Sequence, residues 1–118
     1  SIACYYYIQG AYRTCGISTT SIANGWNHFC STYDGQNLNF YINGSLANTY
    51  SHANTQPISH LTNTPFVIGA DSSQFAGGID YSQPRFTGKI GPVKVYDIGL
   101  TEEQVKQNFN AMRGRFGL

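Results

Sequence analysis

The chain has 118 residues, enough for one domain with a real core, and only 11% of them are charged. A net charge of +1 offers no electrostatic basis for binding nucleic acid or an anionic membrane, so we expect neither partner. No stretch approaches the ~18 consecutive apolar residues that a spanning helix needs, and we therefore expect no membrane insertion.

The first predicted element is a strand over 2–8, where β-branched and aromatic residues follow one another almost from the start of the chain. A turn at Gln9-Gly10 comes next. Two short strands are then expected over 11–15 and 18–22, one on each side of Gly16.

The beginning of the chain has no lead-in before this strand. It starts at Ser1, and its only methionine is Met112, so we expect a processed product or a piece of a longer protein. An edge left open beside the run 2–8 would be completed by earlier sequence or by a strand from another chain.

The stretch 26–44 carries the strongest structural signal, and we expect the fold to be organised around it. It predicts two strands joined by Asp34-Gly35, with a second turn at Asn43-Gly44, because both dipeptides tolerate positive φ. Trp26 is expected in the core. Alternation along the second strand predicts a buried face of Leu38, Phe40 and Ile42, and a wet or half-wet face of Asn39 and Tyr41.

After this hairpin the sequence predicts a short strand over 45–50 and a polar loop over 51–65. The loop contains His52 and His60, which we expect to be solvated. His28, inside the hairpin, is expected to be a packed and hydrogen-bonded histidine rather than a catalyst.

Two more strands are expected further along the chain. The apolar run 66–70 predicts a short strand that is buried on both faces or nearly so, and 86–96 predicts the last long strand. Pro92 cannot donate to a strand ladder, so its position marks an edge or a bulge.

One helix is predicted near the C-terminus. Thr101 and Gln104 have the spacing of a capping box, in which the hydroxyl accepts from the backbone N–H at the third helical position and the amide reaches back. Gly114 is expected at the C′ position that ends the helix. The i, i+4, i+7 pattern predicts a buried stripe of Val105, Phe109 and Met112.

The three cysteines, Cys4, Cys15 and Cys30, cannot form a closed disulfide framework within one chain. Two alternatives remain: a disulfide between Cys4 and Cys15 on neighbouring strands, or three buried thiols that pack as small apolar side chains. Their spacing contains no C-x-x-C motif, so we expect no zinc site.

Taken in order, these motifs resemble the C-terminal half of laminin-G-like domains in the concanavalin A-like lectin/glucanase superfamily. The resemblance covers about 26–111. It implies an all-β fold, an antiparallel jelly-roll β-sandwich with one short C-terminal helix. The motifs are Trp26-x-His28-Phe29, Tyr33-Asp34-Gly35, Leu38-x-Phe40-Tyr41-Ile42-Asn43-Gly44, Phe66-Val67-Ile68-Gly69, Phe86-x-Gly88-x-Ile90, Val95-Tyr96-Asp97 and Leu100-Thr101-x-Glu103-x-Val105.

A jelly roll has about eight strands, and only six or seven are predicted here. We therefore expect one domain over 1–118 that lacks N-terminal strands: a fragment, a minimal version, or a sandwich completed by a neighbour. The C-terminal residues 108–118 are similar to the ends of such domains in bacteriophage structural proteins, particularly those of marine cyanophages.

The resemblance to glucanases does not extend to their chemistry. These enzymes need two carboxyl groups about 5–10 Å apart on an inward-facing strand. The chain has six acidic residues and no E-x-D-x-x-E pattern, and most of the six are explained by turns or by the helix N-terminus. We expect no enzymatic activity and no catalytic residues.

The long connection 71–85 is the predicted ligand site, because it brings aromatic rings beside amides and charged groups. Stacking and hydrogen bonding there suit a glycan, and the same residues suit a protein contact. We expect no cofactor; calcium, which takes several oxygens, would have only Asp71 and Asp80 as ligands. The site comprises Asp71, Gln74, Phe75, Asp80, Tyr81 and Arg85.

Two functions follow as hypotheses. The first is a non-enzymatic module of a virion, in capsid decoration or a tail appendage, that contacts neighbouring subunits or further copies of itself. The second is a lectin-like module that binds host or cell-surface glycans. Both place the chain at a virion surface or outside the cell, as its reliance on amides and hydroxyls for polarity also indicates.

Overall fold

The computed structural model describes residues 1–52, 54–59, 65–71 and 81–118. The chain separates into two units, one formed by Ser1–Ser59 and Tyr96–Leu118 and the other by His60–Val95. Every strand and helix of the described residues belongs to the first unit.

Strands β1 (Ile2–Ile8) and β2 (Ala11–Ile17) form an antiparallel hairpin. Its two-residue turn, Gln9-Gly10, has positive φ at both positions, which matches the twist of the strands. The expectation of two short strands around Gly16 is wrong, because β2 runs through this glycine. The 18–22 stretch instead contains the 3₁₀ helix η1 (Thr19–Ser21), whose first turn is capped by the Ser18 hydroxyl.

The second sheet has the order β3-β4-β5, with β3 (Phe29–Tyr33), β4 (Asn37–Ile42) and β5 (Ser45–Ser51). The predicted hairpin and its two turns are confirmed. Asn43 and Gly44 both have positive φ, as expected, whereas at the first turn only Gly35 does. There the Asp34 carboxylate holds the turn by accepting from the backbone N–H groups of Gln36 (2.8 Å) and Asn37 (2.6 Å).

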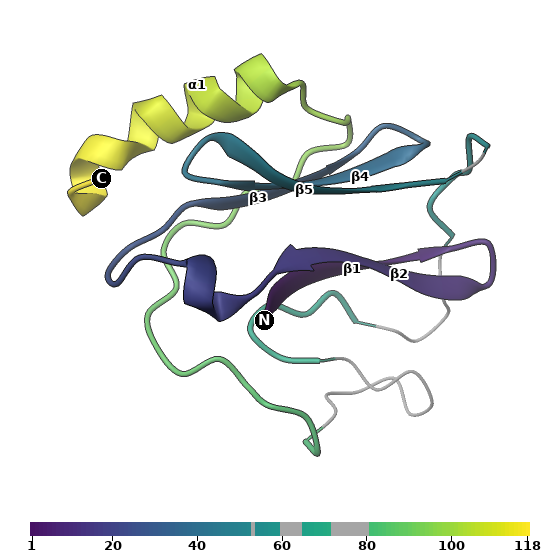
Figure 1. The fold of residues 1–118 in the computed structure, drawn as a ribbon, viewed down its shortest axis with the longest axis horizontal. Coiled ribbons are helices and arrows are strands. Elements are labelled where there is room, and N and C mark those ends of the chain that lie inside the picture. The colour runs from purple at the N-terminus through teal and green to yellow at the C-terminus, as the bar shows by residue number, and fades with distance from the viewer. Residues whose placement is uncertain (53, 60–64, 72–80) are drawn as a thin grey trace. The chain divides into compact units, whose positions relative to one another are not determined.

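The two sheets face each other and enclose the core of the first unit (Figure 1). Leu38 and Phe40 of β4 and Cys15 of β2 are fully buried at its centre, and Ile42 and Tyr6 pack against them. Two polar contacts also join the sheets. The Tyr6 hydroxyl donates to Ser31 Oγ over 3.3 Å, and Asn48 Nδ2 donates to the Gly16 carbonyl over 2.7 Å.

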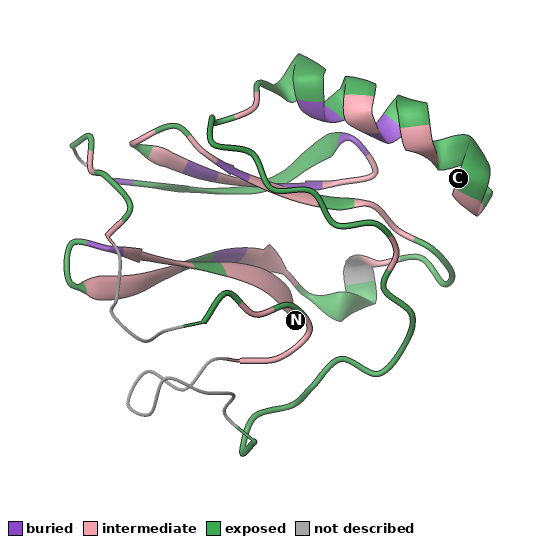
Figure 2. Ribbon diagram, turned by 180° about the vertical axis from the view of Figure 1, so that it is seen from behind, coloured by how far each residue is buried: buried purple, intermediate pink, exposed green. Residues whose placement is uncertain are grey.

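Helix α1 (Glu102–Arg113) lies on the opposite face of the three-stranded sheet (Figures 1 and 2). The capping box of Thr101 and Gln104 is confirmed, with both of its hydrogen bonds present. Val105 and Phe109 are buried. Tyr41, which alternation placed on a wet or half-wet face, is buried too, because the helix covers that face.

Helix α1 ends at Arg113, directly before Gly114 as expected, but Gly114 is not the left-handed residue of a C′ position. Gly114 keeps right-handed helical angles and begins the 3₁₀ helix η2 (Gly114–Phe116). The left-handed residue that stops the chain is Gly117, with φ of 69°. The Leu118 N–H then bonds back to the Arg113 carbonyl over 3.0 Å.

The strands predicted over 66–70 and 86–96 are absent from the described residues. Phe66, expected in a buried strand, is 78% exposed. One backbone hydrogen bond, from the Phe86 N–H to the Gly69 carbonyl (2.7 Å), joins the two segments. Strand propensity alone does not make a strand, because each ladder needs a partner along its length.

Two burial expectations are also overturned. Trp26 is 37% exposed and packs on Phe116, their ring centres 4.9 Å apart, so it lies outside the core. His52 is buried rather than solvated, with the Tyr33 and Tyr50 rings 6.3 and 5.2 Å away. The predicted fold class itself is confirmed: two antiparallel sheets packed as a sandwich, with one C-terminal helix.

Candidate functional site

Half of the predicted ligand site lies within the described residues. Tyr81 is 71% exposed, and the Arg85 guanidinium lies over its ring, 5.3 Å from the ring centre. Asp71 is half-buried. The structure thus brings Tyr81 and Arg85 together, and Gln74, Phe75 and Asp80 lie outside the described residues.

The calcium expectation depends on the same loop. Asp71 is described and Asp80 is not, so the pair of carboxylates stays a prediction. Within the described ranges, no three His, Cys, Asp or Glu side chains gather closely enough to hold a metal ion.

Three of the remaining acidic residues, Asp34, Glu102 and Glu103, have structural roles. Three hydrogen bonds engage the Asp34 carboxylate, and those from the Asn37 backbone and then Gln36 hold its pKa below the usual range. Glu102 and Glu103 lie in the first turn of α1, where the helix dipole favours anions.

Three cysteines lie in or beside the inter-sheet core. Cys4, Cys15 and Cys30 are all free thiols, although Cys4 and Cys15 face each other across the hairpin. Burial raises the pKa of each thiol, which disfavours the reactive thiolate. Of the two alternatives for the cysteines, the structure contains three free thiols, of which Cys15 is buried and Cys4 and Cys30 are half-buried. His28 is half-buried against the Phe109 ring, 5.8 Å away, as expected for a packed histidine.

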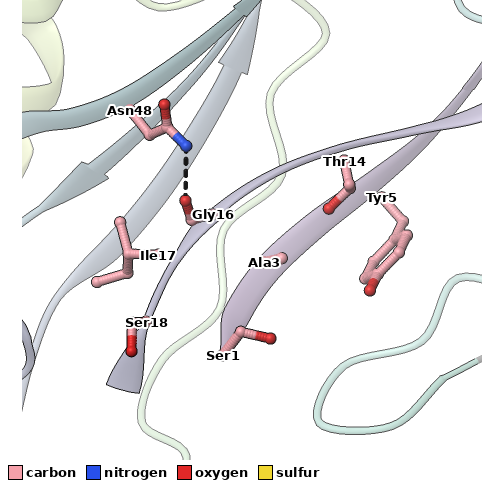
Figure 3. A pocket seen from close by; sticks show the side chains of 8 residues that line it. All are labelled: Ser1, Ala3, Tyr5, Thr14, Gly16, Ile17, Ser18 and Asn48. Carbon is pink, nitrogen blue, oxygen red and sulfur yellow. Dashed lines mark hydrogen bonds between the residues drawn. The ribbon is translucent and has the colours of Figure 1, made fainter. Parts of the chain in front are cut away.

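A second candidate site, which the sequence did not reveal, lies on the outer face of the β1–β2 hairpin. Ile2, Cys4 and Tyr6 point toward the core, so the alternate residues point away from it. On that outer face Ala3 pairs with Gly16, and Tyr5 pairs with Thr14. Ala3 and Gly16 have little or no side chain, whereas Tyr5 and Thr14 are larger. This difference leaves a hollow of ≈ 370 Å³, here called the β1–β2 hollow (Figure 3).

The floor of the β1–β2 hollow is Ala3 with Gly16, and one wall is Tyr5 with Thr14. A Cβ atom at Gly16 would clash with the Ile2 carbonyl oxygen and with the Cα and Cβ of Ala3. Because no side chain fits there, the floor of the hollow is flat. The rim is completed by Ser1, Ile17, Ser18 and Asn48.

The side chains that line the β1–β2 hollow carry no fixed charge, and the α-amino group of Ser1 lies at its rim. Its only side chain that ionises is the Tyr5 phenol. Asn48 is oriented by two bonds, one to the Gly16 carbonyl and one from the Thr49 N–H to its own Oδ1 (2.8 Å). The Ser18 hydroxyl serves the cap of η1, whereas the Thr14 hydroxyl has no partner among the described residues.

The sequence contains part of the signal for this site. Tyr5 and Tyr7 alternate with the inward residues of β1, and Tyr12 lies opposite Tyr7 with the two rings 5.2 Å apart. What the sequence could not provide is the register that sets Thr14 beside Tyr5, since one residue of slip would reverse the faces of β2.

The described part of the chain contains no helix with the length and apolar character that crossing a membrane requires.

A family model described as "Concanavalin A-like lectin/glucanases superfamily" matches residues 2–106. The match therefore includes β1 and β2, which precede the segment on which the sequence resemblance rests.

Two proteins illustrate the similarity. "Female protein" of Nothocricetulus migratorius is 29% identical in an alignment of length 87, and the match covers 67% of this chain and 34% of that protein. This chain thus spans about a third of its curated relative. A crystal structure of an S-layer domain-containing protein (residues 221–444) from Clostridium thermocellum ATCC 27405 has a TM-score of 0.55 at 20% identity, covering 84% of this chain and 45% of that one. That likeness concerns the fold alone, and neither relative supports the expected similarity to bacteriophage proteins.

Proposed function

Because the chain belongs to the concanavalin A-like lectin/glucanases superfamily, we propose that it is a non-enzymatic module that binds carbohydrate. The observation that carries the proposal is the β1–β2 hollow, where the exposed Tyr5 ring lies beside Thr14 and the Asn48 amide lies at the opposite end, next to Gly16 (Figure 3). Such a combination provides apolar area for a sugar ring and directional bonds for its hydroxyls.

The structural roles of three carboxylates support the proposal that the chain has no glycosidase activity. Glycoside hydrolysis needs one carboxyl group as acid and a second as nucleophile or base. Asp34 is engaged in its turn, and Glu102 and Glu103 are at the helix N-terminus. None of these three lines the β1–β2 hollow.

A glycan array probed with the intact chain tests the proposed function. We expect binding to at least one glycan, inhibition by the same saccharide added free in solution, and no release of shortened products after long incubation. An array without specific binding would remove the carbohydrate-binding proposal, and released products would remove its non-enzymatic part.

Location outside the cell or at a virion surface accords with a module of this kind and is part of the proposal. The virion assignment depends on the C-terminal resemblance alone and stays a prediction. Detection of the native protein in purified particles or in the extracellular fraction would decide between the two locations.

A role in assembly is the second candidate, and one observation favours it. Several apolar side chains of the described residues 66–71 and 81–98 are exposed, as on surfaces that a partner covers. The largest exposures are those of Phe66, Val95, Ile98, Ile90 and Phe86.

Size-exclusion chromatography with light scattering tests this second candidate. If neighbouring copies cover these side chains, the chain will elute as a concentration-dependent oligomer. Replacing the exposed Phe66 and Val95 by serine would then shift it toward the monomer. A monomer at all concentrations would count against self-assembly.

A further inference from the structure

We infer that the β1–β2 hollow takes an uncharged saccharide, with one sugar ring stacked on Tyr5 and hydroxyls bonded to Thr14 and Asn48. This assignment deepens the proposed function and rests on it. The saccharide then binds at the β1–β2 hairpin rather than at the 71–85 loop.

Shape is the first argument. The β1–β2 hollow is an open depression of ≈ 370 Å³ on the sheet surface, which is large enough for a sugar ring. Ala3 and Gly16 form a floor without bulk, and no heavier side chain can stand at Gly16 because the β1 backbone is too close. The hollow is therefore a consequence of strand packing and does not depend on a mobile side chain.

The second argument compares the two exposed tyrosines. Tyr5 is 60% exposed and makes no ring or cation contact with any described residue. Tyr81 is 71% exposed, but the Arg85 guanidinium already lies against its ring. A sugar can stack on Tyr5 without displacing a protein group, whereas stacking on that face of Tyr81 must displace Arg85.

Hydrogen-bonding capacity is the third argument. Asn48 is held in place by bonds through Nδ2 and Oδ1, and the second N–H of its amide remains able to donate. The Thr14 hydroxyl can donate and accept, and no described residue engages it. A donor already fixed by protein contacts loses little freedom when a ligand binds.

The charge of the lining side chains, as distinct from the Ser1 α-amino group at the rim, favours a neutral saccharide. The lining side chains include no lysine, arginine or histidine that could pair with the carboxylate of a sialic acid or with a sulfate. Desolvating such an anion without a partner is unfavourable. Neutral hexoses and N-acetylhexosamines bring no charge into the hollow, so they match it better.

The test uses an array on which neutral oligosaccharides stand beside sialylated and sulfated forms of the same structures. We expect the intact chain to prefer the neutral forms. Calorimetry with the best neutral oligosaccharide should then show affinity lower by about tenfold in Tyr5→Ala, through the lost stacking surface. Ala3→Leu, which fills the floor, should abolish binding.

Tyr81→Ala is the matched control, since it removes a tyrosine of similar exposure from the other candidate site and should leave the affinity unchanged. Melting curves confirm that each variant is folded, and Thr14→Val provides a further variant with weakened binding if Tyr5→Ala is unstable. Binding that survives Tyr5→Ala and Ala3→Leu, or binding to acidic glycans only, would overturn the inference while leaving carbohydrate binding intact. No binding to any glycan would remove the proposed function as well.

Discussion

At the scale of single residues, Gly16 has more influence than its lack of a side chain suggests. It lies opposite Ala3 in the hairpin, and the β1 backbone approaches it so closely that a Cβ would overlap Ile2 and Ala3 atoms. The same residue accepts the Asn48 bond that links the two sheets. A strand glycine of this kind marks close approach of another backbone rather than a weak point of the sheet.

The prediction at this scale is that Gly16→Ala lowers the free energy of unfolding by about 2 kcal/mol, because backbone atoms must move to admit the methyl group. Gly114→Ala is the matched control. Gly114 has φ of −61° and open space around its Cα. That variant should be neutral or more stable by about 0.5–1 kcal/mol. If both substitutions changed the free energy of unfolding equally in urea denaturation, the close approach of the β1 backbone to Gly16 would be contradicted.

At the scale of elements, local chemistry explains which segments formed as expected. The capping box starts α1 without help from distant residues, and the turns of the second sheet use side chains or left-handed residues within the turn. The segments over 66–70 and 86–96 have strand-like composition but no ladder in the described residues. A helix or hairpin whose caps and turns are encoded locally forms as expected. A segment with strand-like composition forms no strand when it lacks a neighbouring strand to pair with.

The Asp34 turn gives a prediction with a pH dependence. Backbone N–H bonds lower the pKa of this carboxyl below its ordinary 3.8, so the folded state favours the ionised form. The resulting stability is present above pH 3.8 and is lost as the pH falls through the lower folded-state pKa.

Asp34→Ala should therefore destabilise the chain at pH 7 by about 1 kcal/mol, a modest value because the exposed carboxylate is screened by solvent. The difference from the unmodified chain should shrink as the pH falls below 3.8, as chemical denaturation at each pH would show. Asp97→Ala serves as an exposed carboxylate for comparison. A difference that stays constant between pH 7 and pH 2 would refute this account of the turn.

At the scale of the whole molecule, the first unit contains a three-layer arrangement: the β1–β2 hairpin, the three-stranded sheet and α1 (Figure 1). Strand β4 lies at its centre and is buried on both faces, by Phe40 toward the hairpin and by Tyr41 toward the helix. The second unit, His60–Val95, contributes no strand or helix from its described residues. Stability is therefore expected to come mainly from the first unit.

A pair of aromatic substitutions tests this picture. Phe40→Ala removes a fully buried ring between the sheets and should cost about 3–5 kcal/mol. Trp26→Ala removes a larger ring that is partly exposed and packs on Phe116, so about 1–2 kcal/mol is expected. Thermal or urea unfolding of both variants measures the difference. If Trp26→Ala proved the more damaging, the core would not lie where the structure places it.

The candidate sites were predictable to different degrees. Aromatic, amide and charged residues mark the 71–85 loop in the sequence, and Tyr81 and Arg85 do lie together. The β1–β2 hollow was not predicted, because its residues come from both strands of a hairpin and from β5. Neither Thr14 nor Asn48 belongs to a motif, and only pairing and sheet packing bring them near Tyr5.

By itself, the sequence determined what depends on neighbours along the chain: the capped start of α1, the hairpin of β3 and β4, and the alternation that buries Leu38 and Phe40. The tertiary structure alone decided what depends on distant partners. Tyr41 and His52 are buried because other elements cover them, and Trp26 is partly exposed and packs on Phe116 of the C-terminal turn. The physical reason is that propensity and turn chemistry act over a few residues, whereas burial, strand pairing and a binding hollow arise only when separate segments meet.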